Sequence, residues 1–163
     1  VLVFSFMFKK LSPTMATILF FAYSFINGIT MATIFAVFSM TTIFRAFFTT
    51  ALLFGALALY GYKSNKDMTK FGTIFSVALI VGLVVSIINL FVGSSLIDII
   101  LDWVMLLVFC GLTAHDMNNI KHMQNYVSCD EEKIYIYCAM DLYLDFINIF
   151  IRLLSIFARY DRD

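Results

Sequence analysis

The chain has 163 residues, of which 62% are hydrophobic and 13% are charged, and its formal net charge is zero. Soluble domains are about half apolar and about a quarter charged, so this composition excludes an ordinary soluble domain and indicates a protein that lies in lipid. A chain without an excess of basic residues is not expected to bind nucleic acid, because it cannot neutralise the phosphates.

Five stretches are long and apolar enough to cross a bilayer, which takes about 20 mostly apolar residues. The opening residues 1–8 are too short, and we interpret them as the tail of a helix whose beginning is missing from a truncated chain. The predicted spans are about 14–38, 43–62, 71–91, 96–115 and 134–157. Because the apolar runs are continuous and do not alternate with period two, they predict an all-α transmembrane helical bundle and no β-barrel. Residues 1–163 are expected to form a single domain.

The last predicted span carries polar side chains where charge is most costly. Asp141 and Asp145 are four residues apart and share one helix face, Asn148 lies about 60° away, and Arg152 is nearly in line. An ionised aspartate at the middle of the bilayer costs about 2.5–3.5 kcal/mol on insertion scales, so this stripe must face the interior of the bundle. One hypothesis is that Asp145 and Arg152 simply pair and hold the helix in place.

The best-placed partner for Asp145 is Asp116, at the end of the fourth span. Two carboxylates that lie close together in a low dielectric do not both ionise readily and can share a proton. We therefore interpret the pair as a pH-responsive latch that holds two helices together when protonated and separates them when deprotonated. Asp102 falls on roughly the same face as Asp116. It marks the far end of an ion path or, as we favour, lies at the membrane interface beside Trp103.

The remaining polar residues predict structural roles more than chemistry. For Asn27 and Asn89 we favour interhelical hydrogen bonds, worth about 1 kcal/mol or less each, over pore lining. His115 and His122 lack a spaced His or Cys partner, so we expect loop or interface roles and no metal or cofactor. The cysteines form no CxxC pair, and the sequence has no GxSxG, HExxH or P-loop motif, so the chain is not expected to be an enzyme.

Six blocks, in order and at plausible spacing, resemble the Bax inhibitor motif family of multi-helix membrane proteins. The most specific is LYLDFINIF at residues 142–150, close to the family pattern LYLDFINLF, and GLTAHD, which ends at Asp116, is similar to GLTAYD. The others are NGIT, YGYKSNKDMTKFG, IINLFVGSS and NNIK. The resemblance runs from about Asn27 to the C-terminus, and the closing DRD is most similar to the bacterial branch.

The resemblance implies a seven-helix bundle, here without the first helix and most of the second, in which the last helix is central. It implies a pH-sensitive calcium leak whose proton sensor is the pair Asp116 and Asp145. The membrane would be a bacterial inner membrane or, for a eukaryotic member, an endomembrane such as the endoplasmic reticulum. The alternative is a non-conducting regulatory protein that acts through a partner, either a membrane-bound protease or the apoptosis machinery.

Three residues depart from the family pattern. His115 replaces the usual tyrosine, Asp141 stands where a small residue is common, and Arg152 replaces an aromatic or aliphatic residue. Since the second helix supplies charged residues that engage the aspartate pair in the family, Arg152 is expected to substitute partly for that missing counter-charge.

Overall fold

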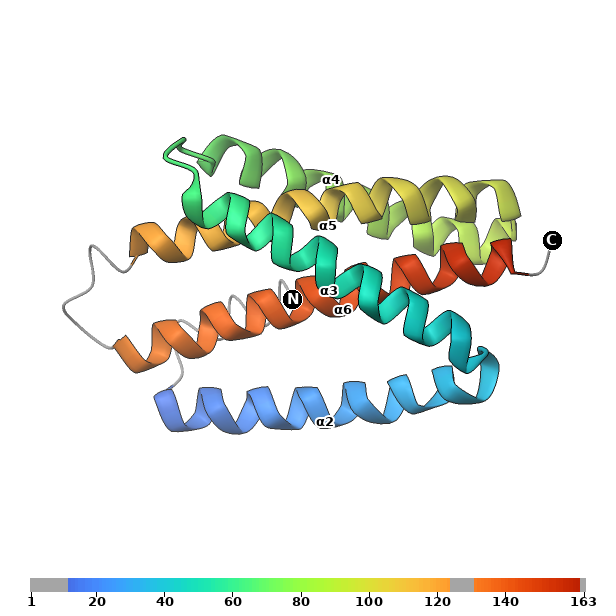
Figure 1. The fold of residues 1–163 in the computed structure, drawn as a ribbon, viewed down its shortest axis with the longest axis horizontal. Coiled ribbons are helices and arrows are strands. Elements are labelled where there is room, and N and C mark those ends of the chain that lie inside the picture. Colours follow the sequence, from blue (N-terminus) through green and yellow to red (C-terminus); the bar gives the residue numbers. More distant parts are fainter. Residues whose placement is uncertain (1–11, 124–130, 162–163) are drawn as a thin grey trace.

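The computed structural model describes residues 12–123 and 131–161, and within these ranges it contains five helices (Figure 1). All five are long and apolar enough to cross a membrane. The prediction of an all-α transmembrane bundle is therefore confirmed, while the partial helix expected at residues 1–8 lies outside the described residues. The helices are α2 (Pro13–Val37), α3 (Met40–Lys63), α4 (Thr69–Val92), α5 (Ser95–Met123) and α6 (Glu131–Tyr160).

Local sequence signals set several of the helix ends. The side chain of Ser12 accepts a hydrogen bond from the backbone three residues later, and Pro13 occupies the first turn of α2, where its missing N–H costs nothing. Ser39 caps α3 in the same way. Gly93 ends α4 with a φ of 68°, a left-handed conformation that glycine adopts without steric cost.

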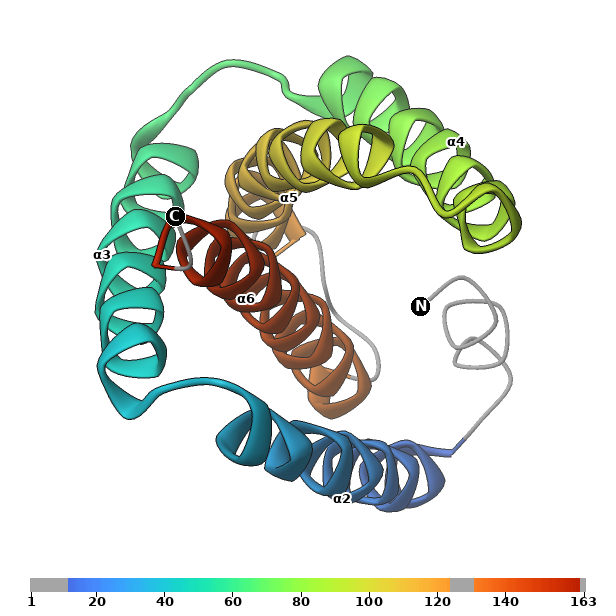
Figure 2. The same ribbon diagram turned by 90° about the vertical axis from the view of Figure 1, so that its right-hand side faces the viewer.

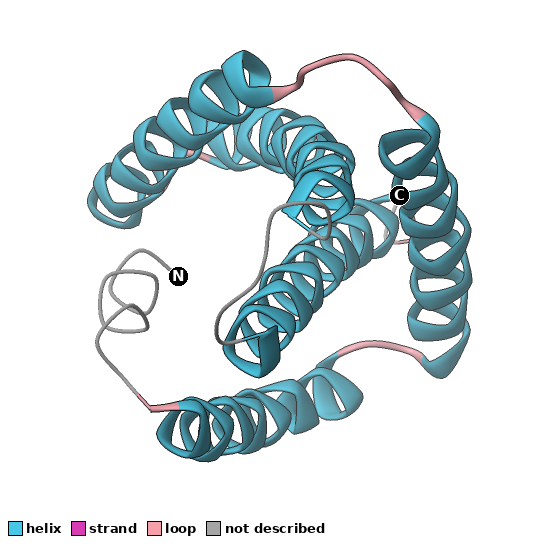
Figure 3. Ribbon diagram, turned by 90° about the vertical axis from the view of Figure 1, so that its left-hand side faces the viewer, coloured by secondary structure: helices cyan, strands magenta, loops and turns pink. Residues whose placement is uncertain are grey.

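Helix α6 occupies the centre of the bundle. The two end-on views show α2, α3 and α5 around it, with α4 on the outer side of α5 (Figures 2 and 3). The helix contacts agree, because α6 packs against α2, α3 and α5, whereas α4 packs mainly against α5. This places the helix that contains residues 142–150 in the centre, as the family resemblance implied.

Two apolar clusters hold the helices together. The larger cluster joins α3, α4, α5 and α6 and includes the fully buried Met105, Ile149 and Leu154. The smaller cluster joins α2 to α6 and is centred on Ala16 and Met140. Most other large apolar side chains point outward, which is expected where the surrounding solvent is lipid.

The polar end of α5 anchors the connection between α3 and α4. Helix α5 continues to Met123, past the predicted end at about residue 115. In this extension Asn118, only 3% exposed, donates hydrogen bonds to the carbonyls of Gly61 and Ser64, each at 3.1 Å. The first carbonyl lies in the last turn of α3 and the second at its C-cap, where no intrahelical donor is available. Asn118 is therefore a structural residue that the sequence analysis missed.

Replacing Asn118 by alanine is expected to lower the free energy of unfolding by about 1–3 kcal/mol, because the buried carbonyl of Gly61 loses its donor and the carbonyl of Ser64 keeps only Lys121 Nζ, at 3.3 Å. Asn119→Ala is the matched control, since Asn119 is the exposed neighbour on the same helix. Denaturant unfolding in detergent micelles measures the difference. Equal stability of the two variants would show that the carbonyls find other donors.

Candidate functional site

Three aspartates line one cavity among α4, α5 and α6. The cavity has a volume of about 260 Å³ and brings Asp116 of α5 together with Asp141 and Asp145 of α6. Their neighbours in its wall include polar and apolar side chains from all three helices, among them Ser76, Leu79, His115, Asn119, Tyr137 and Cys138. The two aspartates expected to form a pair are thus accompanied by a third carboxylate.

Asp145 is the most deeply placed of the three carboxylates. It is 4% exposed and lies beside the hydroxyl of Thr113, yet its Oδ2 atom has no hydrogen-bond partner among the described residues. Asp116 and Asp141 are both close enough to act on it electrostatically. A buried carboxylate oxygen without a partner is costly unless a proton or a cation satisfies it. The cavity therefore has the chemistry of a proton or cation site.

His115 holds the carboxylate of Asp116 at the cavity wall. Its Nδ1 atom lies 2.8 Å from Asp116 Oδ1, and its side chain is 14% exposed. The ring packs so closely against Gly72 of α4 that a Cβ atom at residue 72 would overlap it. Of the two roles expected for His115, the loop role was wrong, because α5 continues well beyond this residue, and the interface role stays a prediction.

Arg152 lies outside this cavity and binds Asp102. Its Nη1 atom is 2.9 Å from Asp102 Oδ1, while Asp102 Oδ2 accepts from Arg159 at 2.8 Å and from Ser155 at 2.6 Å. The hypothesis that Arg152 pairs with Asp145, or supplies the counter-charge beside Asp116, was therefore wrong. Arg152 lies two helical turns beyond Asp145 on α6, where it faces a different part of α5.

Asp102 is buried inside the bundle, and the position at the membrane interface that we favoured for it stays a prediction. Its side chain is 6% exposed, whereas the next residue, Trp103, is 53% exposed. Successive residues on a helix point about 100° apart, so Trp103 faces outward while Asp102 faces α6. Asp102 is the buried centre of a charge network that joins α5 to the second half of α6.

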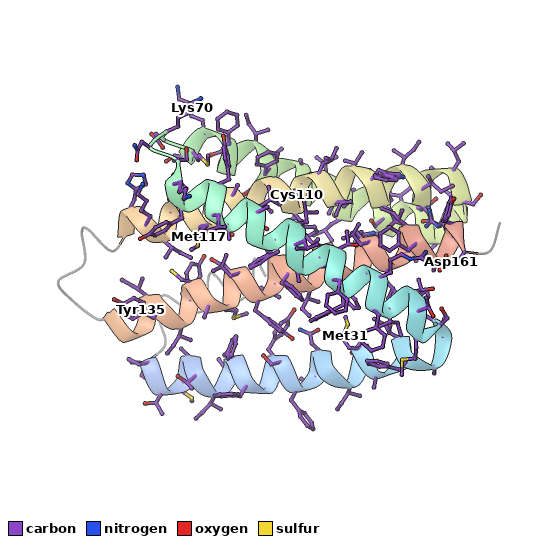
Figure 4. All side chains as sticks on the ribbon, in the orientation of Figure 1. Met31, Lys70, Cys110, Met117, Tyr135 and Asp161 are labelled. Carbon is purple, nitrogen blue, oxygen red and sulfur yellow. The ribbon has the colours of Figure 1, made fainter. Side chains whose placement is uncertain are left out.

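A second ion pair ties the end of α6 to the start of α3 (Figure 4). Asp161 accepts a hydrogen bond from the hydroxyl of Thr42 and forms a 2.9 Å ion pair with Arg45. The Thr42 hydrogen bond and the Arg45 guanidinium lower the pKa of the Asp161 carboxyl below its usual value. Asp161 is thus ionised at neutral pH, and both contacts persist there.

The three asparagines of the predicted spans have different surroundings. Asn89 links α4 to α5, because its amide donates to the Ser94 carbonyl at 3.1 Å and to Asp98 at 2.6 Å. Asn148 donates to the carbonyl of Leu144 in its own helix. The Nδ2 atom of Asn27 is buried, and among residues 12–123 and 131–161 it has no partner, so the interhelical hydrogen bond expected for it is not found there.

The aspartates do not form a ready-made metal centre. Among residues 12–123 and 131–161, no group of three or more His, Cys, Asp or Glu side chains is placed to hold a metal ion.

Comparison with known proteins shows similarity to the Bax inhibitor family along nearly the whole chain. The profile of the family described as "Inhibitor of apoptosis-promoting Bax1" matches residues 1–162. Inner membrane protein YbhL of Escherichia coli is 38% identical over 162 residues, which cover 97% of this chain and 69% of YbhL. An uncharacterized membrane protein of Streptococcus pyogenes is 37% identical over 94% of this chain and 67% of its own length. An uncharacterized protein of Rickettsia prowazekii is 36% identical over 90% of this chain and 63% of its own length.

The chain thus spans about two-thirds of the length of these relatives. The shared region includes the five apolar helices and the central helix with its LYLDFINIF block. On the family profile and these identities, this multi-pass membrane protein belongs to the Bax inhibitor motif family.

Proposed function

We propose that the chain is a proton-gated cation leak pathway, with calcium as the transported ion and the three-carboxylate cavity as its gate. The observation that carries the proposal is the buried Asp145, whose Oδ2 has no partner and which shares a cavity with Asp116 and Asp141. The likeness to an inner membrane protein of Escherichia coli supports a bacterial inner membrane as its location.

The gating follows from the charge that each protonation state places in the cavity. When the carboxyls are protonated, the cavity is neutral and α5 and α6 stay packed together. When they lose their protons, up to three negative charges surround a space of about 260 Å³ and repel one another. That repulsion moves the cavity end of α6 away from α5. The same charges attract a cation.

The oxygen atoms around the cavity suit a weakly held calcium ion. Calcium takes six to eight oxygen ligands, and the three carboxylates together with the amide of Asn119 offer several of them. A leak pathway needs binding that is strong enough to admit the ion and weak enough to release it. Carboxylates spread over two helices, without a closed coordination shell, meet that need.

The second candidate is a non-conducting regulator that acts on a membrane protease or a cell-death pathway. The network of Asp102, Arg152 and Arg159 favours it, because there buried charge serves to join helices without lining a cavity. If the cavity carboxylates had the same purpose, they would stabilise the fold and transport nothing. The two candidates differ in whether the purified chain conducts.

Calcium flux into dye-loaded liposomes at pH 6 and pH 8 tests the proposal. We expect the unchanged protein to conduct severalfold faster at pH 8, and Asp145→Asn, which stays neutral, to conduct slowly at both pH values. Asp98→Asn is the control. Asp98 is an acidic residue of α5 that lies outside the cavity, where it accepts a hydrogen bond from Asn89. A calcium flux that changes neither with pH nor with the Asp145 substitution would support the second candidate, the non-conducting regulator.

A further inference from the structure

We propose that an apolar barrier inside the bundle is the constriction that a cation must cross in the leak. The barrier is formed by Met105 and Phe109 of α5 and Ile149 of α6. It lies between the carboxylate cavity and the charge network around Asp102. Its role in transport rests on the proposed function, whereas the closure of the bundle interior at this level is a property of the fold.

On α5, the two barrier residues share one helix face with two aspartates. In chain order this face carries Asp102, Met105, Phe109 and Asp116. At about 100° per residue, the directions of these four side chains differ by no more than about 60°. The two aspartates are fourteen residues apart, which corresponds to about 21 Å along the helix. The barrier residues thus occupy the length of α5 that separates its two acidic side chains.

On α6, Ile149 takes the same intermediate position. It follows Asp145 by four residues and precedes Arg152 by three, and all three side chains share one helix face. Helices α5 and α6 run antiparallel (Figure 1). Their polar side chains meet on both sides of the barrier, in the carboxylate cavity and in the ion pair of Arg152 with Asp102. The apolar side chains of the two helices therefore lie at one level between these contacts.

Close packing leaves the barrier without contact to solvent. Met105 is 1% exposed, Phe109 5% and Ile149 0%, and all three belong to the larger apolar cluster. The sulfur of Met105 lies so close to Gly82 of α4 that a Cβ atom there would overlap it. Phe109 also forms part of the cavity wall, so the cavity ends directly at the barrier. Because apolar constrictions exclude water and ions, this one closes the interior in the present conformation.

The carboxylates on the two sides of the barrier differ in how their charge is satisfied. Asp145 Oδ2 has no partner among the described residues, as expected for a group that exchanges with water or a cation. Beyond the barrier, one oxygen of Asp102 binds Arg152 and the other binds Arg159. That carboxylate needs no further partner. The barrier thus separates a site that is open to a ligand from one that is closed.

The position of Ile149 links the barrier to the proposed gate. Ile149 lies one turn after Asp145 on the same helix. Repulsion in the cavity that moves this part of α6 away from α5 therefore also separates Ile149 from the two barrier residues of α5. One movement of α6 then exposes the carboxylates and opens the constriction behind them.

Polar substitutions of similar size test the barrier. Glutamine is unbranched and about as long as methionine, so Met105→Gln brings an amide, and water with it, into the barrier. We expect its calcium flux into dye-loaded liposomes at pH 6 to rise severalfold, toward the value at pH 8. Ile149→Thr tests the barrier independently from α6 and should raise the pH 6 flux in the same way.

Two control variants separate polarity inside the barrier from other effects. Met105→Leu keeps the barrier apolar and should leave the pH 6 flux low. Leu107→Gln places the same amide on the lipid-facing side of α5, where Leu107 is 68% exposed, and should also leave that flux unchanged. Only protein that elutes in size-exclusion chromatography as the unchanged chain does is reconstituted, and retention of the entrapped dye shows that the bilayer is intact.

The outcomes distinguish the barrier from the proposed function. If the unchanged protein conducts with the expected pH dependence, but Met105→Gln and Ile149→Thr leave the pH 6 flux as it was, the barrier is overturned and the proposed function stands. If the unchanged protein conducts at neither pH while both polar variants conduct, the proposed function is rejected and the barrier is established. A complete absence of flux in every variant rejects both.

Discussion

Replacing Asp102 by leucine is expected to destabilise the bundle by about 3 kcal/mol, because two arginines lose the carboxylate that both of them bind. Removing one partner of a buried ion pair typically costs about 3–5 kcal/mol. The lower end applies here, since the side chain of Arg159 is 37% exposed and water compensates part of its loss. Arg152, at 24% exposed, accounts for most of the expected effect.

Denaturant unfolding in micelles measures this loss, and a double-mutant cycle assigns it. The variant that combines Asp102→Leu with Arg152→Leu should be less destabilised than the sum of the two single variants, because the charges then disappear together. Asp161→Asn is the control for a more exposed pair and should cost about 1 kcal/mol or less. If the two single effects add without coupling, the Arg152 contact contributes nothing to the fold.

The apolar helices could be predicted from the sequence because lipid imposes one simple requirement. Continuous apolar runs of about 20 residues must be helices when they cross a bilayer. The end of α5 could not be predicted in this way, since its last turns are polar and resemble a loop. They stay helical because Asn118 and Lys121 bind the carbonyls at the end of α3, and such tertiary contacts leave no trace in an apolar window.

The carboxylates of the candidate site could also be predicted from the sequence, because helical spacing gives the face on which a residue lies. Spacing does not say which residue of another helix stands opposite, and this is why Arg152 was assigned to the wrong partner. The missing information was the antiparallel alignment of α5 and α6. Asp102 lies fourteen residues before Asp116 on α5, and Ser155 lies fourteen residues after Asp141 on α6. The Ser155 hydroxyl donates a hydrogen bond to Asp102. Once the aspartates share a cavity, this alignment predicts the network.

Gly61→Val is the substitution expected to disturb both the fold and the site. A Cβ atom at residue 61 would overlap the backbone carbonyl of Ala114 on α5, and a backbone atom cannot turn aside as a side chain does. The two helices must therefore separate, at an expected cost of about 1–3 kcal/mol. Because Ala114 lies two residues before Asp116, the same displacement moves a carboxylate of the cavity.

Gly55→Ala is the matched control on the same helix, since no atom lies within 4 Å of where its Cβ would be. Alanine is a better helix former than glycine by about 0.5–1 kcal/mol, so Gly55→Ala should leave the unfolding free energy unchanged or raise it. We expect Gly61→Val to unfold at lower denaturant and to change the pH 8 to pH 6 ratio of calcium flux, and Gly55→Ala to do neither. Equal behaviour of the two variants would show that α3 and α5 tolerate a wider separation, and that the position of Asp116 does not depend on their close contact.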